Sequence, residues 1–313
     1  MTSEAGVLPA GVSSSRGVYF LANDHVLELA VAFLNSFRAH NPTMPLCFIP
    51  FDCDAVEVAR MQGKYGFSVY RDGAILRRCD AISQRFHGRT IGHYRKLAAW
   101  EGPLEDFLYI DVDTVILDAI DFVFAFLWSF DFVTSHSNSP SLERWVWKRS
   151  IDGTGRLTDR QRAFSANTGF IASKKGALRL EAAERSATLA ATLAPHMNLE
   201  CQEQPFLNYL MVTAGGRYTS LAVLSTSGNP YPIKLEHWAG RKGATIRGGQ
   251  LSPVRGRPPV LLVHWAGEWQ ARTRDHLLNS VLRWLGFQRP TGREAMRFRM
   301  PYGRLWRYYR WLR

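Results

Sequence analysis

The chain has 313 residues, of which 46% are apolar, and its formal net charge is +12. This length and apolar content exclude a chain that is disordered throughout, because they allow a large buried core. The four cysteines have no paired spacing, which excludes a cysteine-bound metal, and the positive charge predicts acidic partners.

Strands and helices alternate in the first half of the chain. Apolar runs predict strands at Val18–Ala22, Leu46–Phe51 and Phe67–Arg71, and amphipathic runs predict helices at Val26–His40 and Ala55–Tyr65. This alternation is typical of a parallel sheet flanked by helices. Open sheets of this kind bind ligands beyond the carboxyl ends of their strands, where Asn23 and Asp24 are expected to lie.

The second half of the chain is predicted to extend the same layers. The predicted strands are Phe107–Leu117, Phe132–Ser135, Thr168–Ser173, Tyr218–Leu224 and Val260–Val263, and the predicted helices are Ala177–Leu193 and Gln204–Val212. The segment Asn229–Pro259 is rich in Gly, Pro, Arg and Lys, which is typical of a mobile substrate loop.

Two carboxylates, Asp111 and Asp113, interrupt the apolar strand predicted at Phe107–Leu117. Alternate residues of a strand share a face, so we expect their Cα atoms roughly 6.5–7 Å apart, at about 3.3 Å per residue. Two anions repel unless a cation lies between them, and paired oxygens suit Mg²⁺ or Mn²⁺. The alternative is that both residues only end the strand and cap the next turn.

The tetrapeptide His-Trp-Ala-Gly occurs twice, at His237–Gly240 and His264–Gly267. The predicted strand Val260–Val263 delivers His264 to its carboxyl end, on the same rim as the aspartates, which makes His264 a candidate third metal ligand. His237 is a rival for that position. The alternative for each histidine is a buried, hydrogen-bonded imidazole beside a tryptophan.

Five motifs, in this order, resemble those of the GT-A fold glycosyltransferases, and most of all the retaining family 8, which includes glycogenin and bacterial lipopolysaccharide galactosyl- and glucosyltransferases. The motifs are Tyr94–Leu97, Phe107–Leu117, Ser165–Phe170, Glu203–Asn208 and His264–Gly267. The resemblance runs from about Val18 to Trp269. It implies an α/β fold with a Rossmann-like, mixed and mainly parallel sheet flanked by helices, and with Asp-x-Asp at a strand end.

The resemblance also implies an activity. The chain would move a sugar from a nucleotide-diphosphate sugar, a UDP-sugar, to a glycan or lipid-linked acceptor with retention of the anomeric configuration. Asp111, Asp113 and His264 would hold Mn²⁺ or Mg²⁺, which stabilises the charge that develops on a diphosphate leaving group. The donor would contact Ala22, Asn23, Asp24, Lys96, Asp111, Val112 and Gly267. The catalytic positions would be Lys96, Asn167, Glu203 and Gln204.

Two positions depart from the family pattern. Glu203 stands where the family has Asp, and Gln270 stands where it has the Lys of a Lys-Pro-Trp motif. Phosphate charge would then have to come from Arg272, Arg274 or Arg241–Lys242. Retention of the anomeric configuration rests on family analogy alone.

Two other classes of function compete with this interpretation. In a haloacid-dehalogenase-like phosphatase, Asp111 would be the nucleophile and Asp113 the general acid, but such enzymes need a further acidic cluster, and the acids beyond Lys175 are scattered. A non-enzymatic nucleic-acid-binding protein would spread basic charge over the sheet, whereas here it concentrates at the C-terminus. We therefore do not expect nucleic acid as a partner.

The segment Arg293–Arg313 interleaves arginines with aromatic residues, which suits an anionic membrane surface. An RNA-stacking tail and a tail packed on the domain are the alternatives. No signal peptide or spanning segment is expected, so we predict a cytoplasmic protein attached peripherally to the inner face of the cell membrane. The predicted division is a flexible N-terminus at 1–16, a GT-A catalytic domain at 17–287 and a basic aromatic tail at 288–313.

Overall fold

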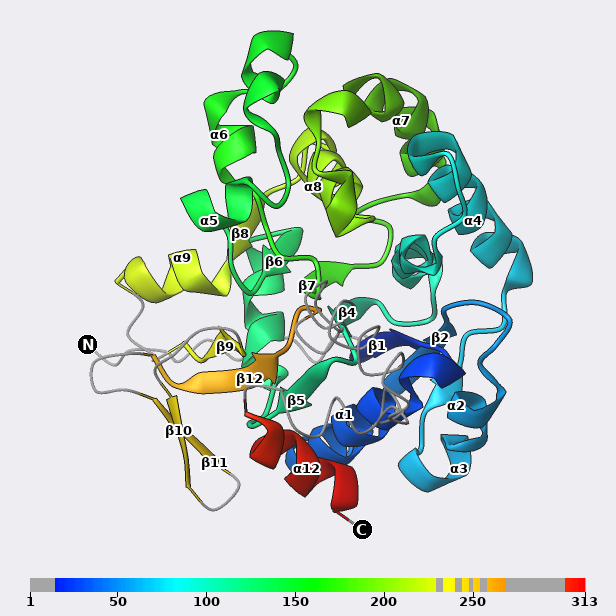
Figure 1. Ribbon diagram of the computed structural model, residues 1–313, viewed down its shortest axis with the longest axis vertical. Coiled ribbons are helices and arrows are strands. Elements are labelled where there is room, and N and C mark those ends of the chain that lie inside the picture. The colour runs from blue at the N-terminus through cyan, green and yellow to red at the C-terminus, as the bar shows by residue number, and fades with distance from the viewer. Residues whose placement is uncertain are drawn as a thin grey trace, which may run out of the picture.

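The computed structural model describes residues 15–228, 233–239, 244–247, 250–253, 258–267 and 302–312. Its centre is a sheet with the strand order β3-β2-β1-β4-β7-β6-β8 (Figure 1). The strands are β1 (Arg16–Ala22), β2 (Leu46–Pro50), β3 (Ser68–Val69), β4 (Asp106–Ile110), β6 (Phe132–Thr134), β7 (Phe170–Lys174) and β8 (Tyr218–Ser220). Neighbours are parallel except where β7 pairs antiparallel with β4 and β6. The predicted mixed, mainly parallel sheet is confirmed.

Helices cover both faces of this sheet (Figure 1). The α-helices are α1 (Leu27–His40), α2 (Val56–Arg60), α3 (Gln62–Tyr65), α4 (Gly73–His87), α5 (Pro140–Glu143), α6 (Asp159–Ala163), α7 (Leu180–Leu193), α8 (Gln204–Thr213), α9 (Leu221–Thr226) and α12 (Gly303–Trp311). The 3-10 helices are η1 (Asp24–Val26), η2 (Gly92–Glu101), η3 (Asp121–Trp128), η4 (Arg149–Thr154), η5 (Ala194–His196) and η6 (Leu199–Cys201).

The sequence of β1 shows why helices pack on both faces of the sheet. Tyr19 and Leu21 belong to the core beneath α4, α7 and α8, whereas Val18 and Phe20 belong to the core on the side of α1. Because alternate side chains point to opposite faces, a continuous apolar run such as this one buries both faces of its strand.

A smaller sheet with the order β5-β12-β9 lies beside the first. It consists of β5 (Thr114–Ile116), β12 (Val260–His264) and β9 (Leu235–Trp238), with β12 antiparallel to β5 and parallel to β9. A separate hairpin pairs β10 (Ala244–Arg247) with β11 (Gln250–Pro253). The segment expected to be a loop therefore contains strands where the structure describes it.

The prediction of one strand at Phe107–Leu117 is wrong. The chain leaves the large sheet at Ile110 and enters the small sheet at Thr114. The Thr114 hydroxyl donates to the backbone oxygen of Asp111 at 2.7 Å, which stabilises a turn between the two strands. The two aspartates therefore lie on this turn and not on one face of a continuous strand.

Other helix and strand boundaries also differ from the predicted ones, in one case because a side chain caps a helix. The strand predicted at Tyr218–Leu224 ends at Ser220, whose hydroxyl accepts from the backbone N–H of Val223 and begins α9. The predicted helix Ala55–Tyr65 is two short helices, and it ends as expected at Gly66, which adopts a φ of 61°. Helix α4 was not predicted, although Asp72 caps its first turn.

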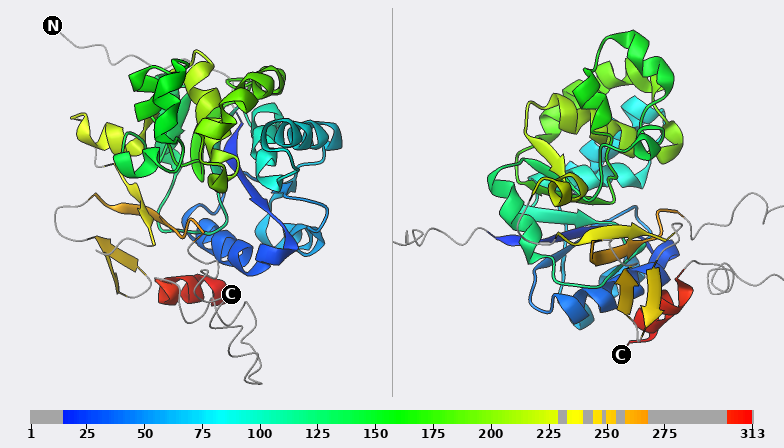
Figure 2. Two further views of the ribbon diagram at one scale, coloured as in Figure 1. Left: turned by 45° about the horizontal axis from the view of Figure 1, so that its top comes forward. Right: turned by 90° about the vertical axis from the view of Figure 1, so that its left-hand side faces the viewer.

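The C-terminal helix α12 lies beside α1 (Figure 2). Leu305, Trp306 and Tyr309 are buried against residues of α1, β5 and β12. Two guanidinium nitrogens of Arg310 form a bidentate salt bridge with the carboxylate of Glu28 in α1. Trp306, one of the aromatic residues that suggested a membrane surface, is instead buried in the protein, as the alternative of a tail packed on the domain predicts for this helix. None of the helices in the described part of the chain has the length and apolar character needed to cross a membrane.

We expect Trp306→Ala to lower the free energy of unfolding by about 3–5 kcal/mol, because it removes a large side chain that is only 4% exposed. Trp311 belongs to the same helix but is 62% exposed, so Trp311→Ala should change that free energy by at most about 0.5 kcal/mol. Urea unfolding of both variants measures the difference. Equal destabilisation would contradict the packing of α12.

Candidate active site

The turn between β4 and β5 is held from both sheets. The backbone N–H of Asp111 donates to the carbonyl of Gly169 at 2.9 Å, and the backbone N–H of Trp265 donates to the carbonyl of Asp113 at 2.9 Å. Gly169 directly precedes β7, and Trp265 directly follows β12. The turn therefore stands at the carboxyl end of β4, where open sheets of this kind bind ligands.

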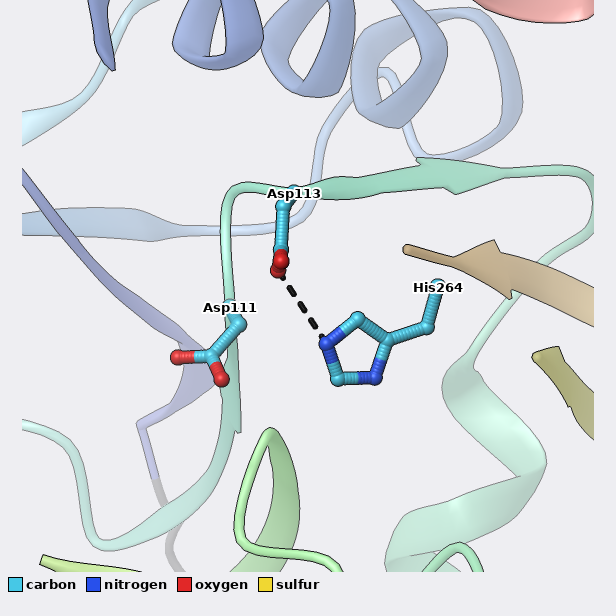
Figure 3. Close-up of side chains that lie close together, drawn as sticks. All are labelled: Asp111, Asp113 and His264. Carbon is cyan, nitrogen blue, oxygen red and sulfur yellow. Dashed lines mark ion pairs between the residues drawn. The ribbon is translucent and has the colours of Figure 1, made fainter. Parts of the chain in front are cut away.

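Asp111, Asp113 and His264 form a cluster at this turn (Figure 3). One potential ligand atom from each residue lies within 4.8 Å of the other two. Nε2 of His264 lies 3.1 Å from Oδ1 of Asp113. Hard carboxylate oxygens with one imidazole nitrogen are a donor set that Mn²⁺ accepts, so these residues fit the predicted cation.

The structure separates the two candidate histidines. His264 points from the end of β12 toward the turn with the aspartates (Figure 3). His237 lies on β9, where its Nε2 is 2.9 Å from the hydroxyl oxygen of Tyr302. Its ring also packs edge-on against that of Tyr302. The geometry therefore favours His264 as the third ligand, as the strand argument predicted.

Glu236 is a site residue that the sequence did not single out. It is buried on β9, and its Oε1 lies 2.5 Å from Nδ1 of His264. Burial by itself would raise the pKa of this carboxyl, but the imidazole of His264 brings the pKa down to about 2. The one sequence signal was its position directly before the first His-Trp-Ala-Gly, on a strand that turns out to lie beside β12.

The carboxylates around His264 also change the pKa of its imidazole. Burial by itself would lower the pKa of this imidazole, but Asp113 and Glu236 together hold the pKa well above its usual range. With no cation bound, the protonated imidazole would therefore bridge two carboxylates.

Lys96 forms a second buried charge group with Asp111 and Glu203. Its side chain is 2% exposed, and its Nζ lies 3.0 Å from Oδ1 of Asp111 and 2.6 Å from Oε1 of Glu203. Tyr109 donates its hydroxyl to the same Asp111 oxygen at 2.7 Å. Burial opposes the charge on Lys96, but the two carboxylates raise its pKa above the usual range. Lys96 and Tyr109 thus fix the carboxylate of Asp111.

The segment Asn167–Gly169 closes the cluster from the side of β7. A Cβ atom on Gly169 would come within 2.5 Å of Cε1 of His264 and 2.7 Å of Oδ2 of Asp111, so only glycine fits. Oδ1 of Asn167 accepts from the backbone N–H of Gly169 at 3.0 Å. Oε1 of Gln204 accepts from the backbone N–H of Thr168 at 3.4 Å. The predicted Asn167 and Gln204 are therefore both beside the cluster.

The residues predicted to contact the nucleotide lie at the end of β1 and directly after it. Ala22 ends that strand, and Nδ2 of Asn23 donates to Oδ2 of Asp52 at 2.8 Å. The carboxylate of Asp24 accepts from the backbone N–H groups of Glu57 and Val58 at 3.1 and 3.0 Å, which places it at the start of α2. Contact of these residues with a nucleotide stays a prediction.

Two further predicted positions lie on the turn or shortly after β12. Val112 is buried between the two aspartates in the chain. The backbone N–H of Gly267 donates to Oδ2 of Asp113 at 3.2 Å. The basic residues that were considered for phosphate contact lie outside the described residues. These are Arg241, Lys242, Arg272 and Arg274.

No protein-family model matches the sequence, and no curated protein matches it. Solved structures do resemble it. The apo form of WbbM, a bifunctional glycosyltransferase, is similar over 93% of this chain at 13% identity with a TM-score of 0.49; the chain spans 52% of that protein, about half its length. The galactosyltransferase LgtC, solved with donor and acceptor sugar analogues, is similar over 90% of this chain and 99% of its own, at 14% identity and a TM-score of 0.47.

GlyE of Streptococcus pneumoniae TIGR4, also a glycosyltransferase, is similar over 96% of this chain and 61% of its own, at 11% identity and a TM-score of 0.48. All three proteins are named as glycosyltransferases, the class that the motifs predicted. At such low identities and scores, the function of this chain has to be argued from the residues of its own site.

We expect Lys96→Met to lower the free energy of unfolding by about 3–5 kcal/mol, because it leaves the buried carboxylate of Glu203 without its cation. Adding Glu203→Gln should restore part of this loss. As a control, Arg78→Met removes an ion pair with Glu184 whose side chains are 41% and 30% exposed, and it should cost at most about 1 kcal/mol.

Urea unfolding of the four proteins, including the unchanged chain, measures these differences. A Lys96→Met variant no less stable than Arg78→Met would show that the buried charge group does not act as described.

Proposed function

We propose that this chain is a glycosyltransferase that moves a sugar from a nucleotide-diphosphate sugar, a UDP-sugar, to a glycan or lipid-linked acceptor. The reaction requires Mn²⁺ or Mg²⁺ and retains the anomeric configuration of the donor. A cytoplasmic location at the inner face of the cell membrane belongs to the same proposal. The observation that carries it is the cluster of Asp111, Asp113 and His264 at the carboxyl end of β4.

The charge around this cluster supports a bound cation. Four carboxylates meet two basic side chains here, and the six residues are Asp111, Asp113, Glu203, Glu236, Lys96 and His264. Even with the imidazole protonated, four negative charges against two positive ones leave a formal charge of −2. Partly buried negative charge is costly unless it is compensated, and a divalent cation compensates it.

The side chains of the cluster have distinct tasks in this proposal. Asp111, Asp113 and His264 hold the cation, which when bound stabilises the charge that develops on the diphosphate leaving group. Lys96 keeps the Asp111 carboxylate in place. Because Gly169 has no side chain, its backbone can approach Asp111 and His264 closely.

Donor contacts are assigned to the residues around this cluster. Val112 lies between the aspartates in the chain, and Gly267 contacts Asp113. Ala22 ends β1, the strand that pairs with β4, and Asn23 and Asp24 follow it. The rim beyond adjacent parallel strands is where nucleotides bind in open α/β sheets, which supports a nucleotide between these two chain segments.

The donor sugar is assigned to the side of α8. Gln204 begins this helix and touches the segment that contains Asn167, and Glu203 precedes it. Both Asn167 and Glu203 already have partners, since Asn167 donates to Glu236 and Glu203 pairs with Lys96. We assign them to the wall of the sugar pocket, with Glu203 nearest the anomeric carbon.

With Mn²⁺ present, we expect one member of a panel of nucleotide sugars to release free nucleotide when the protein is added. Asp111→Asn and Asp113→Asn should each slow this release at least about 100-fold, because they remove charge that holds the cation. Asp121→Asn, in an exposed acid of η3, is the control and should leave the rate unchanged. Undiminished turnover in both site variants would overturn the proposal.

We expect the affinity for Mn²⁺ alone to rise with pH, by about tenfold per unit, until pH reaches the pKa of His264. The sign follows from the raised pKa of this imidazole, since the proton on Nε2 must leave before the nitrogen can bind a cation. Titration calorimetry in buffers of different ionisation enthalpy should show proton release.

Substituting each histidine in turn tests which of them binds the cation. His264→Ala should weaken Mn²⁺ binding and flatten its pH dependence, whereas His237→Ala, which loses a contact with Tyr302, should change neither. The reverse pattern would make His237 the ligand.

A further inference from the structure

Glu236 reaches the cluster because of the register of two parallel strands. In the small sheet, His264 of β12 pairs with Trp238 of β9, and Leu262 pairs with Glu236. The carboxylate of Glu236 lies behind the imidazole, on the side of the ring opposite Asp113. Glu236 as a whole is only 5% exposed.

Every described contact of this carboxylate is with a donor. Oε1 accepts from Nδ1 of His264 at 2.5 Å and from Nε1 of Trp238 at 2.8 Å. Nδ2 of Asn167 lies 2.8 and 3.0 Å from the two oxygens, and the hydroxyl of Ser135 donates to Oε2. A carboxylate with this many donors is held in one orientation, because any rotation breaks several hydrogen bonds.

These contacts decide the tautomer of the imidazole. A carboxylate only accepts, so Nδ1 of His264 must carry a proton, and the lone pair of the neutral ring is then on Nε2. Nε2 is the atom that faces Asp113. Carboxylates behind metal-ligating histidines commonly fix the ring in this way.

The same carboxylate also orders the opposite wall of the cluster. Asn167 donates to Glu236 through Nδ2 and accepts from the backbone N–H of Gly169 through Oδ1. This chain of hydrogen bonds holds Gly169 against Asp111 and His264, where a Cβ atom would not fit. One buried carboxylate therefore contacts both the imidazole and the residue that positions the glycine segment.

We infer that Glu236 is a positioning residue of the cation site, which orients His264 through Nδ1 and the Gly169 segment through Asn167. It is not a ligand itself, because the ring of His264 lies between it and Asp113. This inference rests on the proposed function only in requiring a cation at the cluster, and it assigns Glu236 no contact with the substrate.

The test uses Mn²⁺ alone on the full chain, with no nucleotide sugar. We expect Glu236→Gln to weaken Mn²⁺ binding about 10–100-fold, the usual effect of losing a partner that orients a metal ligand. Pulsed electron paramagnetic resonance should also show that the coupling between bound Mn²⁺ and an imidazole nitrogen is diminished or lost. A role in packing alone would leave that coupling unchanged.

Glu101→Gln is the matched control, because this carboxylate accepts from the backbone N–H of Leu180, outside the cluster. It should preserve both the affinity and the nitrogen coupling. Glu236→Gln with unchanged affinity and coupling would overturn the inference. If the unchanged protein bound no Mn²⁺, the proposed function would fail instead.

A measurement on the unchanged protein covers the case in which Glu236→Gln does not fold. Nitrogen-15 NMR of histidine-labelled protein loaded with diamagnetic Zn²⁺ should show His264 protonated at Nδ1 and ligated at Nε2. The opposite arrangement, with Nε2 protonated, would overturn the orientation assigned to Glu236.

Discussion

Compensation of buried negative charge is the constraint on which this site depends. The chain turns from one sheet to another at Asp111–Asp113, and further carboxylates at Glu203 and Glu236 approach the same turn. Carboxylates gathered out of water stay ionised only beside positive charge or hydrogen-bond donors. Lys96 and His264 supply part of that charge, and the proposed cation would supply the remainder.

The mixed topology of the sheets brings the residues of this cluster together. Strand β7 runs antiparallel to β4, so the segment before β7 meets the end of β4 and places Gly169 beside Asp111. Strands β9 and β12 run parallel in the small sheet and bring Glu236 and His264 to the turn together. The cluster is thus built where two sheets meet, and backbone pairing fixes the distances between its side chains.

The C-terminal helix has a structural role that its composition concealed. Arginine and aromatic residues made this segment resemble a membrane-binding tail, yet Trp306 and Tyr309 pack against α1 and Arg310 pairs with Glu28. Helix α1 in turn contacts β5, the strand that follows the two aspartates. Composition describes an amphipathic helix but does not specify which surface covers its apolar face.

The sequence by itself determined the alternation of strands and helices and the buried character of β1 and β4, and it marked Asp111, Asp113 and His264 as candidate ligands. Periodicity and residue chemistry are local properties, so these features could be predicted from the chain. Only the tertiary structure decided that Phe107–Leu117 divides between two sheets, that His264 rather than His237 meets the aspartates, and that Glu236 lies behind the imidazole. Each of these depends on the pairing of strands far apart in the sequence, and the side-chain pattern of one strand does not encode its partner.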